Sequence, residues 1–276
     1  MSKRIDLSEA RVLLTGAGGG IGRALAASLL GRGAQIILVG RNQARLSAVA
    51  RELDPGGQRA SVVAADITRA PDRARICVAA SRWNEGVNVL INNAGVNQLC
   101  LFEEESAADI EVALSTNILA PMYLSNALLS SLQRQPAASI LNIGSVLGAI
   151  GHPGHVTYST TKFALRGFSE ALRRELAGTT VKVSYLAPRA TRTSMNAASV
   201  ERMNAELGVA MDAPEVVAEV ACSLIEQGGA TATIGWPESF FSRVNALLPR
   251  LVDNAFRRQL PIIERHARGP QAARGI

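Results

Sequence analysis

Cysteine is scarce in this chain of 276 residues, which contains only Cys77, Cys100 and Cys222. The three lie far apart without the spacing of metal ligands, and their odd number excludes a fully paired disulfide framework. We therefore expect small buried thiols in a reducing compartment, with no part in a site. We also expect no bound metal.

Long apolar runs are missing as well. Hydrophobic residues make up 47% of the chain, yet no uninterrupted apolar stretch approaches the roughly 20 residues that a transmembrane helix needs. The first residues, MSKRIDLSEARVLLTG, contain no apolar segment followed by a small-residue cleavage site. We expect no secretory signal and a cytoplasmic protein.

Aromatic residues are few, at 4% of the chain, and no basic run is interleaved with them. The formal net charge of +6 is spread along the chain among acidic residues. This pattern argues against a nucleic-acid-binding surface, so no nucleic-acid partner is expected. A mildly basic protein does suit an anionic cofactor or substrate.

Short apolar runs, bounded by glycine, proline or polar residues, alternate with helical patterns along the chain. The runs are RVLLTG, QIILVG, SVVAAD, VNVLIN, ASILNIGS, VKVSYLAP and TATIGW. This alternation predicts an α/β fold, a doubly wound parallel sheet of about seven strands with helices on both faces. Strands buried on both faces explain runs that are nearly continuous. We expect one domain over residues 1–235 and an extension over 236–276.

The stretch TGAGGGIG, from Thr15 to Gly22, lies between the first predicted strand and the first predicted helix, with glycine at five of eight positions. Glycine offers no side chain for packing, but it lets a ligand approach the backbone closely. In a doubly wound sheet this turn holds the pyrophosphate of a dinucleotide at the helix N-terminus. An ordinary turn is the alternative for the glycines alone.

Several motifs in sequence order resemble the short-chain dehydrogenase/reductase family. They are TGAGGGIG, the acid of VVAAD, INNAG, the asparagine of STNILAP, the serine of NIGS, and YSTTK. The resemblance covers residues 11 to about 235 and implies a Rossmann-type fold. It implies cofactor contacts from Thr15, Gly16, Gly20, Ile21, Gly22, Asp66, Asn93, Ala94, Gly95, Pro188 and Thr193, and catalytic roles for Asn117, Ser145, Tyr158 and Lys162.

The chemistry of these residue types agrees with such roles. Tyr158 and Lys162 are four residues apart on a predicted helix, so their side chains share one face. A nearby ammonium favours the phenolate, so we expect Lys162 to lower the pKa of Tyr158 and make it an acid/base group. Ser145 can donate a hydrogen bond to the substrate oxygen. In the family, the equivalent of Asn117 helps hold a proton-returning water chain.

The end of the second strand, ILVGRN, indicates the choice of cofactor. NAD-binding folds place an acid here for the ribose 2′-hydroxyl, whereas an arginine favours the 2′-phosphate of NADP. This chain has Gly40 and then Arg41. We therefore expect NADP(H), with Arg41 as a cofactor-binding residue. The alternative is that Arg41 is merely solvated at a helix start.

The stretch LAPRATRTSM departs from the family, which has Pro-Gly after this strand. Pro188 and Thr193 fit the spacing, but Arg189 replaces the glycine. We expect a slightly different loop path, with Arg189 or Arg192 either solvated or at the pocket mouth, where it could meet an anionic substrate group. His152 and His155 are expected to be loop residues, and contact with the substrate is the alternative.

The extension predicts a basic amphipathic helical segment. Its apolar face comprises Phe240, Val244, Leu247, Leu248, Leu251, Val252 and Ala255, and its edge carries Arg243, Arg250 and Arg257. Pro249 and Pro261 should interrupt or kink it. We interpret it as docked on its own domain or on a partner subunit. The alternative is a membrane-surface anchor or lid that admits a lipid-like substrate.

The sequence thus predicts an NADP(H)-dependent oxidoreductase that interconverts a carbonyl and a secondary alcohol. Its substrate is a small molecule, with lipid-like and anionic compounds both open, and a homodimer or homotetramer is expected. The alternative is a sensor or scaffold that binds NADP(H) without turnover, because a fold does not guarantee activity. The loops around 96–104 and 189–212, which set specificity, carry no readable substrate code.

Overall fold

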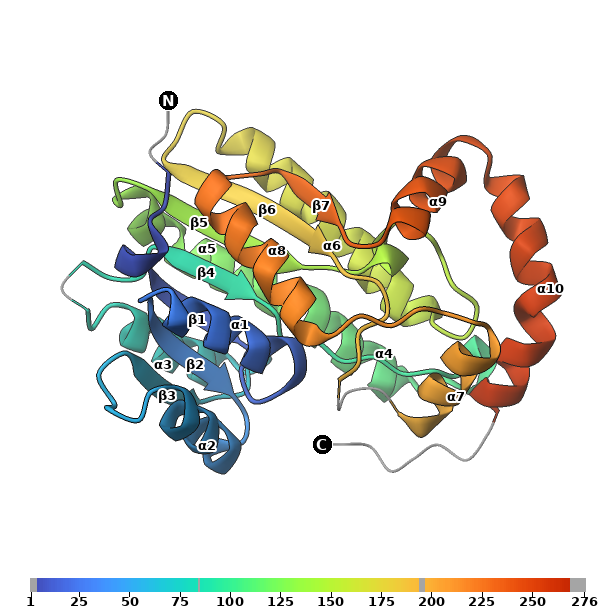
Figure 1. Cartoon of the computed structure of the whole chain (residues 1–276), viewed down its shortest axis with the longest axis horizontal. Helices are drawn as coiled ribbons and strands as arrows, with labels where there is room; N and C mark the ends of the chain where they lie inside the picture. Colours follow the sequence, from blue (N-terminus) through green and yellow to red (C-terminus); the bar gives the residue numbers. More distant parts are fainter. Residues whose placement is uncertain (1–3, 84, 194–196, 269–276) are drawn as a thin grey trace.

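The computed structural model describes residues 4–83, 85–193 and 197–268 (Figure 1). Seven parallel strands form one sheet in the order β3-β2-β1-β4-β5-β6-β7, which confirms the predicted fold class. The strands are β1 (Arg11–Thr15), β2 (Gln35–Gly40), β3 (Ala60–Ala64), β4 (Val89–Asn92), β5 (Ala138–Ile143), β6 (Val181–Ala187) and β7 (Thr231–Thr233).

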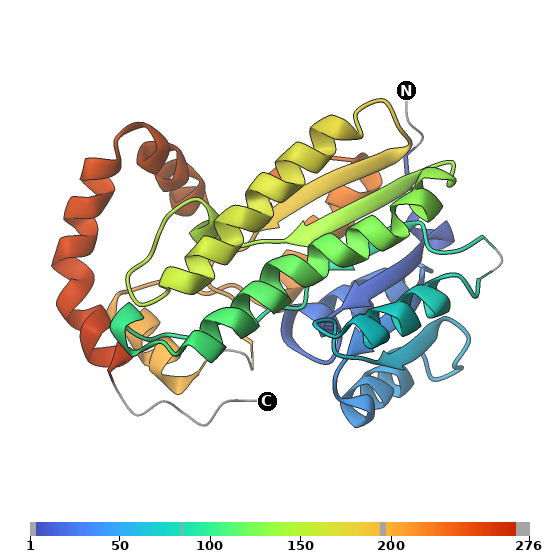
Figure 2. The same ribbon diagram turned by 180° about the vertical axis from the view of Figure 1, so that it is seen from behind.

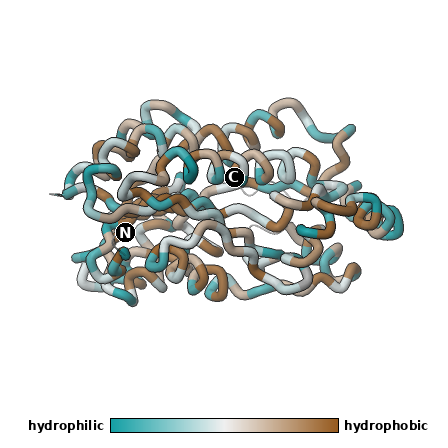
Figure 3. The backbone as a smooth tube through the Cα atoms, turned by 90° about the horizontal axis from the view of Figure 1, so that it is seen from above, coloured by the Kyte–Doolittle hydropathy of each residue, from teal (hydrophilic) through white to brown (hydrophobic). Residues whose placement is uncertain are grey.

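Helices cover both faces of the sheet, as a comparison of Figures 1 and 2 shows. One face carries α1 (Gly20–Gly31), α2 (Gln43–Leu53) and α8 (Pro214–Gln227). The other carries α3 (Ala70–Ala80), α5 (Ala120–Gln133) and α6 (Val156–Glu175). Seen from above in Figure 3, the sheet lies between two helical layers whose turns alternate between hydrophilic and hydrophobic positions. Each layer therefore buries one apolar face.

Burial follows the position of each strand in the sheet. Every residue of β4 and β5 is buried, whereas the edge strands β3 and β7 are only partly covered. In the register, Leu14 of β1 lies opposite Leu38 of β2 and Ile91 of β4. The near-continuous apolar runs of the sequence are thus the central strands.

A long helical stretch precedes β5. It consists of α4 (Ala107–Leu114), the π-helical turn η3 (Ser115–Leu119) and α5. By length and hydropathy, Ala107–Gln133 could cross a membrane. In this fold, however, Leu124, Leu128 and Leu132 of α5 pack into the core on one face of the sheet. Such a pattern is typical of a core helix.

The remaining helical elements are short connections or belong to the region beyond the carboxyl edge of the sheet. They are the 3₁₀ turns η1 (Leu7–Glu9), η2 (Phe102–Glu104) and η4 (Val146–Gly148), and the helices α7 (Ala198–Glu206), α9 (Trp236–Leu247) and α10 (Pro249–Ala267). Helices α9 and α10 form an arch that stands off this edge (Figures 1 and 2). Asn245 ties α9 to η4 through a 2.9 Å hydrogen bond to the carbonyl oxygen of Ala149.

The exposure of the side chains in α9 and α10 differs from the predicted apolar face. Leu247 is 79% exposed and Leu251 is 57% exposed, whereas Ile263 and Ala267 near the end of α10 are fully buried. The chain breaks between α9 and α10 before Pro249, as expected, so one helical period does not continue across both helices. Pro261, in contrast, lies inside α10 without ending it.

The buried end of α10 packs on the domain beside the loops at the carboxyl edge. Ile263 and Ala267 form a cluster with Leu99, Val200 and Met203. Gly154, just before α6, also approaches Ile263, because a Cβ added there would lie 3.2 Å from its methyl group. The last turns of α10 are therefore joined to the segment that leads into α6.

We expect Ile263→Ala to lower the free energy of unfolding by about 3 kcal/mol, since Ile→Ala in a packed core costs roughly 2–5 kcal/mol. Leu247→Ala is the matched control, and its exposed side chain should change stability by less than about 0.5 kcal/mol. Urea unfolding measures both variants. Equal effects of the two substitutions would contradict the observed docking of α10.

Candidate active site

The predicted site residues gather at the carboxyl edge of the sheet. Thr15 ends β1, Asn93 follows β4, Ser145 comes two residues after β5, and Pro188 follows β6 directly. The strand order reverses between β1 and β4, so this edge contains the topological switch point where ligands bind in open α/β sheets. The sequence order of the motifs thus becomes a spatial cluster.

The glycine turn has two functions in the structure. Gly16 and Gly22 serve packing: a Cβ at Gly16 would lie 2.8 Å from the Cα of Ala94, and one at Gly22 would overlap the backbone of Gly16. Gly18 and Gly20 shape the surface, since Gly20 has a φ of +53° and Gly18 has only distant neighbours. The packing therefore excludes side chains beneath the turn, whereas the space above Gly18 is open.

The N-terminus of α1 fits a bound pyrophosphate. Its N-cap is Gly19, and no side chain caps the helix. The first amides of a helix lack internal partners and carry the positive end of its dipole. Ile21 packs into the core below, which holds the turn in place. The turn can therefore hold the pyrophosphate of a dinucleotide.

Thr15 and Asn93 build the floor beneath this turn. The hydroxyl of Thr15 accepts hydrogen bonds from the amides of Asn93 (3.0 Å) and Ala94 (3.1 Å). The amide group of Asn93 donates to the carbonyl oxygens of Thr15 and Gly16. Both side chains thereby join the end of β1 to the loop after β4.

The end of β2 presents exposed positive charge. Arg41 is exposed and forms no ion pair with any residue that the structure describes. A Cβ on Gly40 would lie in ordinary contact with Leu46, at 3.4 Å, so the backbone leaves room for a Cβ there. Asp66, after β3, accepts hydrogen bonds from the amide (2.9 Å) and hydroxyl (2.7 Å) of Thr68. Asp66 therefore shapes its own loop.

Tyr158 and Lys162 lie one turn apart on α6. The ammonium nitrogen Nζ of Lys162 is 5.5 Å from the centroid of the Tyr158 ring and donates a 3.0 Å hydrogen bond to the carbonyl oxygen of Ile143, the last residue of β5. Lys162 is 5% exposed, and burial lowers its pKa to about 8. At neutral pH most molecules still carry the ammonium.

The pKa of Tyr158 corrects a prediction from the sequence. Burial raises the pKa of Tyr158 to about 12, against the opposing effect of a side-chain hydrogen bond with Ser145. The expected lowering by Lys162 is absent because its ammonium donates to the backbone of β5, while desolvation disfavours the phenolate. Tyr158 is therefore a neutral phenol in this state.

Asn117 lies in the π-helical turn η3 and is buried. Its amide nitrogen donates to the carbonyl oxygen of Val96 (2.9 Å) and to the hydroxyl of Thr161 (3.0 Å), and its oxygen accepts from the amide of Val96 (2.8 Å). Gly95 completes this contact, since a Cβ there would lie 3.2 Å from the Asn117 oxygen. Asn117 thus joins the loop after β4 to α6, and π turns are frequent at functional sites.

The loop after β6 is held by Arg189. Its guanidinium forms two hydrogen bonds, of 2.9 and 2.7 Å, with the carboxylate of Asp212, and lies 3.7 Å from Glu238 of α9. Arg189 is therefore neither solvated nor free for a substrate, contrary to both sequence interpretations, whereas Arg192 is exposed. No non-glycine residue in the described ranges has a positive φ, so the arginine is not strained.

Contacts of Pro188 and Thr193 place the loop after β6 near the glycine turn. The carbonyl oxygen of Pro188 accepts a 3.0 Å hydrogen bond from the amide of Val146, just after Ser145. The side chain of Thr193 lies over the turn, because a Cβ on Gly20 would come within 3.0 Å of it. The end of β6 therefore borders both the glycine turn and the serine.

Sequence reasoning missed the location of His155 and the contact of Tyr185. His155 is the N-cap of α6, is buried, and has Nδ1 3.0 Å from the carbonyl oxygen of Gln98. Burial lowers the pKa of His155 to about 3, so it is neutral. Tyr185 of β6 reaches the backbone of Ser145 from below. A tyrosine at a buried position of a central strand was the available signal.

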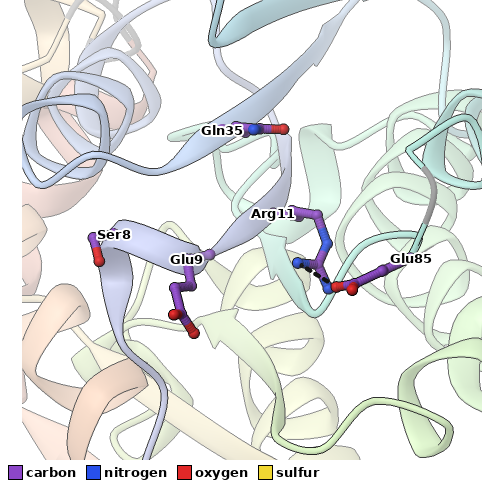
Figure 4. A pocket seen from close by; sticks show the side chains of 6 residues that line it. Ser8, Glu9, Arg11, Gln35 and Glu85 are labelled. Atoms are coloured by element: carbon purple, nitrogen blue, oxygen red, sulfur yellow. Dashed lines mark ion pairs between the residues drawn. The ribbon is translucent and has the colours of Figure 1, made fainter.

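A pocket lies at the amino edge of the sheet, opposite the candidate site (Figure 4). It is lined by Ser8, Glu9, Ala10, Arg11, Gln35 and Glu85, at the amino ends of β1 and β2. Arg11 forms hydrogen bonds with the carbonyl oxygen of Gly86 and with Gln135, and an ion pair with Glu85. The positive charge of Arg11 is thus paired within the protein and is not available to a ligand.

The residues at the carboxyl edge can therefore hold a dinucleotide and deliver a proton to an oxygen beside it. The hydroxyl groups of Ser145 and Tyr158 interact, and Lys162 supplies a nearby positive charge. Within the described ranges, no group of three or more His, Cys, Asp or Glu side chains is placed to bind a metal ion. The three cysteines are free thiols, and Cys100 and Cys222 are buried.

Comparisons with known proteins agree with this geometry. Residues 10–204 match the family model for short chain dehydrogenases. The 3-oxoacyl-(acyl-carrier-protein) reductase of Aquifex aeolicus is 34% identical over 192 residues, which cover 69% of this chain and 77% of that protein.

Two solved structures show similar folds. A short-chain dehydrogenase from Sphingobium yanoikuyae in complex with NADPH has a TM-score of 0.74 and 27% identity, covering 89% of this chain and 96% of that one. The 3-ketoacyl-(acyl-carrier-protein) reductase of Brucella melitensis, complexed with NADH, has a TM-score of 0.75 and 25% identity, covering 83% and 97%. From its motifs, its fold and the matched family model, the chain belongs to the short-chain dehydrogenase family.

Proposed function

We propose that this protein is an NADP(H)-dependent oxidoreductase that interconverts a carbonyl compound and a secondary alcohol. The observation that carries the proposal is the cluster of Ser145, Tyr158 and Lys162 at the sheet edge that also bears the glycine turn. Proton donors beside a dinucleotide site suit carbonyl reduction, because a hydride adds to carbon while the oxygen gains a proton.

The residues have distinct roles in this proposal. The bound nicotinamide supplies the hydride chemistry. Tyr158, a neutral phenol at physiological pH, donates its proton to the substrate oxygen. Ser145 donates a hydrogen bond to the same oxygen and stabilises the developing negative charge. Lys162 stabilises the phenolate that remains on Tyr158, and Asn117 fixes the loop above α6 and supports the return of the proton.

In this proposal the glycine turn and the loops at the carboxyl edge of the sheet bind the cofactor. Gly16, Gly20, Ile21 and Gly22 shape the pyrophosphate site, and Thr15 supports it from below. The loops after β3, β4 and β6 contribute Asp66, Asn93, Ala94, Gly95, Pro188 and Thr193. The solved neighbours are complexed with NADPH in one case and NADH in the other.

The preference for NADP(H) rests on the end of β2. Gly40 adds no negative charge, and the exposed guanidinium of Arg41 has the donor geometry for a 2′-phosphate. An acid at position 40 would instead repel that phosphate.

The relatives suggest which substrates to test first. Two of them are named as reductases of 3-oxoacyl or 3-ketoacyl chains on acyl carrier protein. A 3-oxoacyl thioester therefore leads the panel, followed by simple ketones and steroids. Exposed apolar residues along α4, η3 and α5, including Val112, Leu119 and Met122, support a homodimer or homotetramer. A cytoplasmic location is part of the same proposal.

The second candidate is a sensor or scaffold that binds NADP(H) without turnover. Such a protein needs the glycine turn to bind the cofactor, but it has no use for the buried Lys162. Exposed apolar residues lie on α9 and in the turn after it, and they include Trp236 and Leu248. They leave open a further function for this region, the binding of a membrane surface or of a lipid-like substrate. Activity with the panel separates enzyme from sensor directly.

Tyr158→Phe should abolish turnover of the best substrate, with a loss of at least about 100-fold in kcat, because the proton donor is removed. NADPH affinity, measured by quenching of protein fluorescence, should change little. The matched control is Tyr123→Phe, which removes an exposed hydroxyl from α5. Near-normal turnover by Tyr158→Phe would refute the role of Tyr158.

The double variant Gly40→Asp, Arg41→Ala should reverse cofactor preference towards NADH, since it adds a charge that repels the 2′-phosphate and removes the partner of that phosphate. A Cβ at position 40 would make only ordinary contact with Leu46. Titration of both cofactors against both proteins measures the change. Tighter binding of NADH than NADPH by the unaltered protein would contradict the proposal.

A further inference from the structure

Tyr185 lies in the middle of the sheet below the candidate active site. It belongs to β6, is 2% exposed, and its ring packs in a small cluster with Ile118, Leu165 and Ala187. Its hydroxyl oxygen reaches the segment between β5 and α6. No sequence motif of the family assigns a role to this position.

Among the residues that the structure describes, the hydroxyl of Tyr185 forms hydrogen bonds only with main-chain atoms of two candidate catalytic residues. It accepts a 3.3 Å hydrogen bond from the amide of Ser145 and donates towards the carbonyl oxygens of Ser145 (3.2 Å) and Lys162 (3.4 Å). One side chain thus joins the peptide of the serine to the helix that carries Tyr158. Since these partners are backbone groups, Tyr185 is not a proton donor to substrate.

Two glycines make room for this contact. A Cβ on Gly144 would overlap the Tyr185 ring, and one on Gly148 would overlap its hydroxyl and lie 2.7 Å from the carbonyl oxygen of Lys162. Neither glycine has a positive φ, so backbone conformation does not require them. Their lack of a side chain is explained by the presence of the phenol.

We propose that Tyr185 is a positioning residue that holds the Ser145 peptide at a set distance from α6. The relative position of the serine and tyrosine hydroxyls then depends on a side chain that touches neither substrate nor cofactor. This inference rests on the proposed function, because it assigns Tyr185 an effect through Ser145. Small displacements of a catalytic group are enough to slow a reaction markedly.

The hydroxyl is available for this role over the working pH range. Burial raises the pKa of Tyr185 to about 12, so the phenol keeps the proton that it donates to the two carbonyl groups. Arg166 exerts a minor opposing effect from α6. Tyr185 thus stays a donor and an acceptor at once, as its three contacts require.

The test is a double-mutant cycle between Tyr185→Phe and Ser145→Ala, assayed by NADPH oxidation with the best ketone or thioester of the panel. Tyr185→Phe keeps the ring and removes only the hydroxyl. We expect kcat to fall about tenfold, with the KM of the carbonyl substrate and the affinity for NADPH within about twofold of wild type. A variant that had merely lost structure would not combine a lower kcat with an unchanged KM and an unchanged affinity for NADPH.

The cycle shows whether Tyr185 acts through Ser145. In the Ser145→Ala background, Tyr185→Phe should cause no further loss of kcat. Fully additive losses, or a Tyr185→Phe enzyme with the kcat of wild type, would overturn the positioning role. If Ser145→Ala alone leaves kcat unchanged, the proposed role of Ser145 fails, and this inference fails with it.

Gly144→Ala tests the same contact from the other side. The added methyl group should displace the Tyr185 ring and lower kcat with the same unchanged KM. Tyr123→Phe removes an exposed tyrosine hydroxyl and should leave all kinetic constants unchanged. Circular dichroism and NADPH binding show that each variant is folded. A folded Gly144→Ala enzyme with normal kcat would contradict the proposal.

Discussion

The buried ammonium of Lys162 is the feature on which the arrangement of the site depends. Its hydrogen bond to the carbonyl oxygen of Ile143 joins α6 to the end of β5. Lowering the pKa from 10.5 to about 8 corresponds to a cost on the order of 3 kcal/mol for keeping the charge at neutral pH. A lysine that served only packing would be replaced by an apolar residue without this cost, so the charge is best explained by chemistry at the neighbouring Tyr158.

The surroundings of Lys162 restrict where that charge can lie. Gly95 leaves space beside it, since a Cβ there would be 3.8 Å from the ammonium nitrogen. Asn117 holds the loop of Gly95 against α6, and Tyr185 reaches the carbonyl oxygen of Lys162 from below. Hydrogen bonds from β5, β6, the loop after β4 and η3 thus hold the segments that surround this one charge. Such preorganisation is what stabilises developing charge during a reaction.

The sequence predicted the sheet, its order of motifs and the edge where they meet, because apolar runs report burial and parallel strands bring their carboxyl ends together. It could not predict effects that depend on the surroundings of a single group. Desolvation reverses the expected pKa shift of Tyr158, Arg189 pairs with Asp212 across a loop, and Tyr185 meets Gly144 only after β5 and β6 have paired. The break between α9 and α10 likewise changes which apolar face is buried.

The pH dependence of carbonyl reduction tests the central role of Lys162 most directly. In the proposed mechanism reduction requires the ammonium of Lys162, and the lowered pKa means that this group loses its proton as pH rises through about 8. The kcat/KM of the carbonyl substrate at saturating NADPH should therefore be level below pH 8 and then fall about tenfold per pH unit. Tyr158 remains protonated over that range, since its pKa is about 12. A profile that stays level to pH 10 would contradict the account.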